Sequence, residues 1–160
     1  MPVFRYLLFL LFLAPAAYAK PVPSAVEVPQ TRSLSYQPQR FGDYEVHYSA
    51  FNSTFISPEV AAQYHLKRDT SHGVVNIAVR NVKNSETGTA VTGEITGQHK
   101  NLMTQVKSLK FKEVKEGDAI YYLADFKFSD EELLKFSVDV KPSGSQRTET
   151  VQFEQTFYKQ

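Results

Sequence analysis

The stretch Leu134 to Lys141, LKFSVDVK, decides the fold class of this 160-residue chain. Its apolar residues, with Phe136, Val138 and Val140 among them, alternate strictly with polar ones. A period of two places successive side chains on opposite faces of a β-strand, one face buried and the other in water. The stretch therefore predicts an amphipathic strand in a sheet that covers a hydrophobic core.

The same alternation recurs along the rest of the chain. It is found in Tyr44 to Phe55, Val75 to Arg80, Val91 to Thr96, Ser108 to Lys112, Ile120 to Phe128 and Val151 to Phe157. Turn signals containing Gly, Asn, Asp or Pro separate several of these runs. Seven or eight short strands with this spacing predict an all-β fold, either an antiparallel β-sandwich or a small barrel.

Two segments depart from regular alternation. In Tyr44 to Phe55 the apolar residues change parity at Phe51, which is typical of a β-bulge or a bend. The segment Ser57 to Tyr64 instead begins with a capping serine followed by Pro58 and Glu59, the order expected at a helix start. We therefore expect one short helix at Ser57–Tyr64, between the first two core strands.

The N-terminus has the features of a cleavable secretory signal. Arg5 precedes the apolar run Tyr6 to Leu13, and Ala17-Tyr18-Ala19 forms a small-x-small cleavage site. The apolar run is shorter than the roughly 20 residues that span a bilayer. We therefore predict export to the periplasm, cleavage after Ala19 and no transmembrane span in the mature chain.

The mature chain divides into a linker and one domain. Residues 20–40 are rich in Pro and poor in large apolar residues, which favours an extended, flexible linker. Residues 41–160 hold the strand patterns and form the predicted β-sandwich domain. The full chain has 18 Lys and Arg against 17 Asp and Glu, and cleavage of residues 1–19 removes Arg5 alone. The balanced charge gives no sign of a nucleic-acid partner.

No catalytic, cofactor or metal-binding pattern emerges from the sequence. The chain has no cysteine and no Gly-x-Ser-x-Gly element that would present a nucleophile. His65, Asp69 and His72 lie close together, but their spacing fits no known ligand pattern. The lysines within residues 107–115 are typical of a strand edge protected against aggregation. We therefore expect no catalytic residues, no cofactor and no metal site.

Several motifs from Phe41 onward fit one protein family. They are FGDYEVHYSAFNSTF at 41–55, PEVA at 58–61 with Tyr64 and Arg68, VNIAV at 75–79, FKE at 111–113, DAIYY at 118–122 and the closing Phe157-Tyr158. In these motifs the chain resembles the exported proteobacterial proteins classed as domain of unknown function 4426. The resemblance implies a periplasmic, immunoglobulin-like β-sandwich with no established activity. The chain departs from the expected family pattern at His65, where we expect glycine, and at Asp69, where we expect serine.

Two functions remain open at this point. The first is a non-catalytic binding or interaction module of the periplasm, of an accessory or assembly type, whose partner is an unknown envelope protein. The second is a carrier of small hydrophobic ligands, which requires that the strands close into a barrel-like cavity. The rows of Phe and Tyr predict a filled core and therefore favour the first.

The candidate binding residues are Pro58, Glu59, Tyr64 and Arg68, in the predicted helix and the loop after it. A sandwich can connect two strands with fewer residues, and loops on a rigid scaffold commonly carry binding residues. Tyr64 and Arg68 would share one face if the helix continued for another turn, and both residue types are enriched in interface hot spots. The alternative is a lid, in which Val60 and Tyr64 pin the helix over an open end of the sandwich while Arg68 pairs with an acid.

Overall fold

The computed structural model describes residues 37–159. The predicted signal peptide, its cleavage site and most of the predicted linker lie outside the described residues. The elements follow in the order β1 (Gln39–Phe41), β2 (Tyr44–Asn52), η1 (Ser53–Phe55), α1 (Pro58–Gln63), β3 (His72–Asn81), β4 (Thr89–Ala90), β5 (Gly93–Lys100), β6 (Val106–Leu109), β7 (Lys112–Glu116), β8 (Ala119–Lys127), β9 (Glu132–Pro142) and β10 (Glu149–Phe157). Within this part of the chain, no helix is long and apolar enough to cross a membrane.

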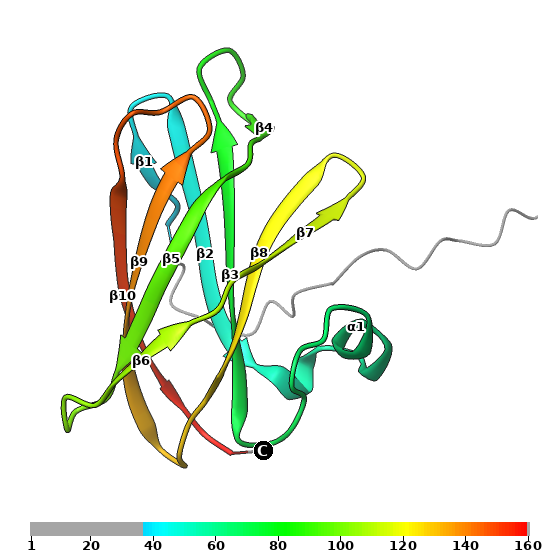
Figure 1. Ribbon diagram of the computed structural model, residues 1–160, viewed down its shortest axis with the longest axis vertical. Helices are drawn as coiled ribbons and strands as arrows, with labels where there is room; N and C mark the ends of the chain where they lie inside the picture. Colours follow the sequence, from blue (N-terminus) through cyan, green and yellow to red (C-terminus); the bar gives the residue numbers. More distant parts are fainter. Residues whose placement is uncertain (1–36, 160) are drawn as a thin grey trace, which may run out of the picture.

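The strands form two antiparallel sheets that pack face to face (Figure 1). Sheet A has the order β1-β2-β3-β8-β7, with the short strand β4 also paired to β3, and sheet B has the order β10-β9-β5-β6. The expected immunoglobulin-like β-sandwich is therefore confirmed, with ten strands in place of seven or eight. Because the strands form two separate sheets, the structure does not have the barrel closure that the carrier hypothesis requires.

Aliphatic and aromatic side chains fill the space between the sheets. Phe136 and Val138 of the LKFSVDVK stretch lie in β9 and are 2% and 0% exposed. The Phe136 ring stacks on Phe153 with centroids 4.8 Å apart and meets the edge of Phe126 at 5.1 Å. Burial of such a ring stabilises the fold by about 1.5–3 kcal/mol. The interior is thus occupied by side chains, as the rows of aromatic residues predict.

Strand β2 runs without interruption through the predicted bulge. Tyr44 to Asn52 pair residue by residue with β3, with no inserted residue. Ala50 faces the main core, whereas Phe51 belongs to a second hydrophobic cluster on the outer face of sheet A. The bulge prediction is therefore wrong. The parity changes because this end of β2 is buried on both faces, by sheet B on one side and by the segment around α1 on the other.

The predicted strand Ser108–Lys112 consists of two strands in different sheets. β6 ends at Leu109 on the edge of sheet B, and β7 begins at Lys112 on the edge of sheet A. Leu109 and Phe111 both pack in the main core, so the alternation continues although the hydrogen-bonding partner changes. At the N-terminus, β1 begins at Gln39, so two residues of the predicted linker pair with β2.

Tyr122 joins the two sheets near the upper end of β5. Its hydroxyl accepts the backbone N–H of Gly93 at 2.8 Å and donates to Glu113 Oε2 at 2.8 Å. β6 pairs only with Gly97 to Lys100 of β5, so Gly93 lies on an otherwise open stretch of sheet edge. The tyrosine therefore satisfies a backbone donor that could otherwise pair with another chain.

Candidate functional site

Helix α1 begins as the sequence predicts. Ser57 Oγ accepts the backbone N–H of Val60 at 3.3 Å, Pro58 occupies the first turn, and Glu59 lies beside it. Hydrogen bonds from its own backbone N–H and from Ser57 lower the pKa of the Glu59 carboxyl. Pro58 and Glu59 are both exposed. These two candidate residues therefore start the helix, and neither faces the cluster beneath it.

The helix ends before Arg68 because His65 turns the chain out of it. Tyr64 is the C-cap, and His65 follows with φ 52°. The backbone N–H groups of His65 and Leu66 donate to the carbonyls of the last turn at 3.2 and 2.8 Å. A residue in the left-handed region just after a helix is usually glycine, which explains the glycine expected here. The helix therefore does not continue for the further turn that would have placed Tyr64 and Arg68 on one helical face.

Arg68 connects the loop after α1 to the segment before α1. Its Nε donates to the carbonyl of Ile56 at 2.7 Å, and its Nη2 donates to the carbonyl of Thr54 at 3.1 Å. The lid hypothesis supposed that Arg68 pairs with an acid, but these two bonds go to backbone carbonyls. Arg68 therefore ties the end of the loop to the segment before α1.

A small pocket lies between α1 and the outer face of sheet A. Figure 1 shows α1 beside the lower half of this sheet. The volume of the pocket is about 40 Å³, and its lining residues are Phe51, Ile56, Val60, Tyr64, Asn76, Val114, Glu116, Tyr121 and Leu123. We call it the α1 pocket. Its walls come mostly from the second hydrophobic cluster, so α1 covers a sheet face and not an open end of the sandwich.

Tyr64 closes the α1 pocket through Glu116. The tyrosine hydroxyl donates to Glu116 Oε1, at the end of β7. This bond to a carboxylate raises the pKa of Tyr64 to about 12. Lys112 adds a second tie, since its Nζ donates to the carbonyl of His65 at 2.6 Å. Of the four candidate residues, Tyr64 alone lines the pocket.

Two oxygens in the wall of the α1 pocket have no partner among the described residues. They are Asn76 Oδ1 and Glu116 Oε2, and both are shielded from solvent. A buried acceptor without a hydrogen bond costs about 1–3 kcal/mol, and native structures contain only a few such atoms. The sequence did not identify either residue. The arrangement suits a bound group that donates hydrogen bonds to both oxygens.

A polar cluster orders the loop between α1 and β3. Asp69 Oδ1 accepts a hydrogen bond from His72 Nδ1 at 2.7 Å and from Ser71 Oγ at 2.8 Å. These bonds, above all the one from His72, hold the pKa of Asp69 well below its usual range. A catalytic triad needs the imidazole between the carboxylate and the hydroxyl, whereas here both side chains contact the same carboxylate oxygen. Within residues 37–159, no group of three or more His, Asp or Glu residues is arranged to hold a metal ion.

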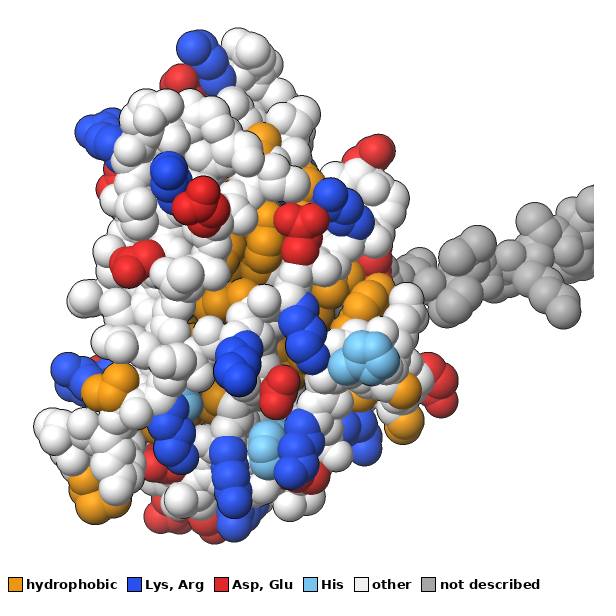
Figure 2. Space-filling view, viewed as in Figure 1, with side chains coloured by type: hydrophobic (Ala, Val, Ile, Leu, Met, Phe, Trp, Pro, Cys, Tyr) orange, Lys and Arg blue, Asp and Glu red, His pale blue; other side chains and the backbone are white. Residues whose placement is uncertain are grey.

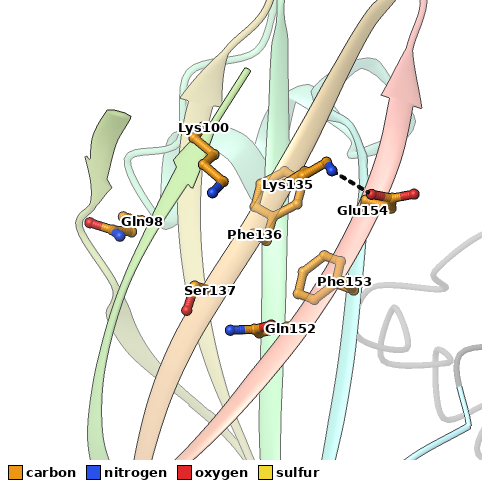
Figure 3. Close-up of a pocket in the computed structure, with 8 residues that line it drawn as sticks. All are labelled: Gln98, Lys100, Lys135, Phe136, Ser137, Gln152, Phe153 and Glu154. Carbon is orange, nitrogen blue, oxygen red and sulfur yellow. Dashed lines mark ion pairs between the residues drawn. The ribbon is translucent and has the colours of Figure 1, made fainter. Parts of the chain in front are cut away.

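A surface hollow lies over the outer face of sheet B (Figure 3). Its volume is about 510 Å³. Polar side chains from β5, β9 and β10 surround it, and Lys135 pairs with Glu154 at 3.6 Å. Phe136 and Phe153 belong to the main core. This hollow is therefore the polar outer surface of the sheet and lacks the converging groups of a defined site.

Comparisons with solved structures place this fold beside two groups of proteins. The chain is similar to a DUF4426 family protein from Pseudomonas aeruginosa PAO1, with 37% identity and a TM-score of 0.67, over 78% of this chain and 95% of that one. It is also similar to FetP of uropathogenic Escherichia coli strain F11, recombinantly expressed in the periplasm, with 12% identity and a TM-score of 0.57, over 78% and 94%. A copper-bound FetP variant gives 12% identity and 0.58, over 78% and 95%. At this identity the likeness to FetP shows the fold alone.

Sequence comparisons agree with the first of these groups. A search of curated proteins finds no significant match. The family model described as Domain of unknown function (DUF4426) matches residues 38–160. This match begins one residue before β1 and includes both sheets and the α1 pocket. The chain therefore belongs to the DUF4426 family.

Proposed function

We propose that this DUF4426 protein is an exported, non-catalytic binding module of the cell envelope, and that the α1 pocket is its binding site. The observation that carries the proposal is the pair of unpaired oxygens, Asn76 Oδ1 and Glu116 Oε2, in an otherwise mostly apolar pocket. In a protein that uses this pocket only for packing, such atoms would weaken the fold without benefit.

The chemistry of the pocket selects a hydrogen-bond donor on an apolar stem. Val60, Val114 and Leu123 supply apolar wall, and the two oxygens accept hydrogen bonds. A lysine ammonium or a side-chain amide on a partner protein has this character. Pockets for whole small molecules are about 300–1,000 Å³, far above the 40 Å³ here. The size therefore favours one terminal group of a protein partner over a free hydrophobic ligand.

The positions of the titratable groups with displaced pKa values support a non-catalytic role. Several groups whose pKa is displaced, namely Tyr64, Asp69 and the Tyr122–Glu113 pair, belong to different elements of the fold. Each is bonded to a neighbour that also holds a loop or a sheet edge in place. General acid–base catalysis needs such groups to converge on one substrate position.

Two features support the envelope as the place of action. The N-terminus has the basic residue, apolar run and small-x-small site of a secretory signal. FetP, which shares the fold, was expressed in the periplasm of E. coli.

Site-specific photocrosslinking in living cells tests the proposal. Gln63 is exposed at the end of α1, next to Tyr64, so a photoreactive residue there samples the region around the pocket. We expect one defined protein to be captured. Glu116→Gln keeps an oxygen for the Tyr64 hydroxyl but removes the carboxylate charge, so it should reduce capture several-fold at unchanged thermal stability.

Two matched controls make the result specific. Glu94→Gln removes a carboxylate that is exposed on β5 and pairs with Lys141, so it should leave capture unchanged. A photoreactive residue at Gln152, on the outer face of sheet B, should capture no such protein. Equal capture by the Glu116→Gln and Glu94→Gln variants would refute the pocket as the binding site. A hydrophobic small molecule that copurifies with the protein would instead support the carrier function.

A further inference from the structure

A second cleft lies between the β5–β6 hairpin and the turn from β8 to β9. These two segments are at the lower end of the sandwich in Figure 1. The volume of the cleft is about 280 Å³. It shares no lining residue with the α1 pocket. Whatever binds here therefore need not touch α1, and we call this site the hairpin cleft.

His99 is the buried polar residue of the hairpin cleft. It lies on β5, is 4% exposed, and packs against Phe126 and Phe136 with ring centroids 5.5 and 5.9 Å apart. Its Nδ1 has no hydrogen-bond partner within residues 37–159. Burial and the nearby Lys107 ammonium lower the pKa of His99. The fold alone gives this unpaired ring nitrogen no role.

Two lysines and one glutamate are the charged residues that line the cleft with His99. Lys107 of β6 is the register partner of His99, and opposite residues of an antiparallel pair project to the same side. Lys127, at the end of β8, also lines the cleft. In the described part of the chain, neither lysine forms an ion pair. Figure 2 shows Lys and Arg side chains gathered over the lower half of this face, with a few acidic ones among them.

The one carboxylate in the lining is already engaged. Glu132 Oε1 accepts a hydrogen bond from Asn101 Nδ2 at 3.1 Å, and its Oε2 accepts one from the backbone N–H of Ser129 at 2.6 Å. Glu132 thereby joins the hairpin on one side of the cleft to the turn on the other. The charged groups that line the cleft with His99 are therefore two free ammonium groups and one carboxylate with bonded oxygens.

Apolar side chains complete the hairpin cleft. Phe128 and Leu134 line it from the main core, and Met103 lines it from the hairpin tip. Leu102 and Met103 are 71% and 72% exposed, and Figure 2 shows hydrophobic side chains at the lower left over this hairpin. An unbranched, exposed methionine adapts readily to a ligand surface.

We propose that the hairpin cleft binds an amphiphilic organic anion, with its carboxylate or phosphate between Lys107 and Lys127 and its apolar part against Met103, Phe128 and Leu134. In the bound state His99 donates from Nδ1 to the same anionic group. The bound anion favours the imidazolium form, so the pKa of His99 rises on binding. The anion is either free in solution or the headgroup of a lipid.

NMR titration of the full mature chain tests this site with defined probes. We expect octanoate and octyl phosphate to shift the His99 ring signals, and to raise the pH midpoint of their titration. Acetate, which lacks the apolar part, and octylammonium, which has the opposite charge, should shift them far less. Lys107→Gln should weaken octanoate binding about tenfold, the effect of losing one charge-assisted hydrogen bond.

Lys110→Gln is the matched control, because Lys110 is exposed in the connection just after β6 and does not line the cleft. It should bind octanoate as the unmodified protein does. Equal weakening in both variants, or equal shifts with octylammonium, would overturn the proposal.

Vesicles containing phosphatidylglycerol distinguish the two possible sources of the anion, a lipid headgroup and a free anion. Lys107-dependent vesicle binding identifies a lipid headgroup, and octanoate binding without vesicle binding identifies a free anion. Binding of neither probe also overturns the proposal.

Discussion

Replacement of His65 by glycine should stabilise the protein. His65 has φ 52°, in the left-handed region that costs an ordinary residue about 1–2 kcal/mol. Its side chain is exposed, and its backbone bonds to α1 and from Lys112 survive the change. Glycine loses about 0.5–1 kcal/mol more chain entropy on folding. At the midpoints of these two ranges the net gain in the free energy of unfolding is about 0.75 kcal/mol.

Thermal and urea unfolding, followed by circular dichroism, measure this gain. Unfolding entropy is about 2.1 cal/mol/K per residue near 60 °C, so for a domain of about 120 residues a gain of 1 kcal/mol raises Tm by about 4 °C. The urea midpoint should rise with an unchanged slope, because the surface exposed on unfolding stays the same.

Gln63→Gly is the matched control for His65→Gly. Gln63 is the last residue of α1 and, like His65, is exposed, but it has helical geometry. Glycine inside a helix costs up to about 1 kcal/mol relative to alanine, and somewhat less at a helix end. The two substitutions should therefore act in opposite directions. A fall in Tm for both would refute the role assigned to the backbone at position 65.

Three further changes test the packing and the polar contacts. Gly73→Ala would place its Cβ 2.4 Å from the Phe126 ring, and the overpacking should lower the unfolding free energy by about 1–3 kcal/mol in urea titrations; an unchanged midpoint would contradict this. Because the pKa of Asp69 is lowered in the fold, its bond with His72 stabilises the protein above pH 3.8, the ordinary pKa, and this stabilisation is lost as the pH falls below that value. The Asp69→Asn variant should therefore be less stable at pH 7, and its stability should depend less on acid pH. Tyr122→Phe removes the hydroxyl that joins the sheets and should lower the unfolding free energy by about 1–3 kcal/mol, with loss of a tyrosine that titrates near pH 12 in the ultraviolet; stability equal to that of the parent would argue against the bridge.

Local patterns were sufficient for the strands and for the start of α1. The alternation around Val138 reflects burial between sheets, and the cap at Ser57 is satisfied three residues away. The docking of α1 was not predictable, because its contacts come from strands far along the chain. Phe51 carried a signal of that second buried face, but a parity change is equally compatible with a bulge.

The polar atoms of the two proposed sites could not be identified from single strands. Glu116 closes a strand before a turn, where an acidic residue is ordinary, and Asn76 alternates with valines and isoleucine as a wet-face residue would. Their oxygens lie in the wall of the pocket that α1 covers. His99 has the parity of Ile95 in β5, so the alternation alone is compatible with an inward position, but its burial depends on Phe126 and Phe136 from other strands.

The most direct test of the proposed binding site is an NMR titration of the mature protein with butylammonium, compared with butyrate. Both probes have the same short apolar stem, but only the cation donates hydrogen bonds at every pH between 6 and 8. The account predicts that butylammonium shifts the signals of Asn76 and Val60, and that Glu116→Gln weakens this response several-fold. Equal responses to the two probes, or a response unaffected by Glu116→Gln, would contradict a donor-selective site in the α1 pocket.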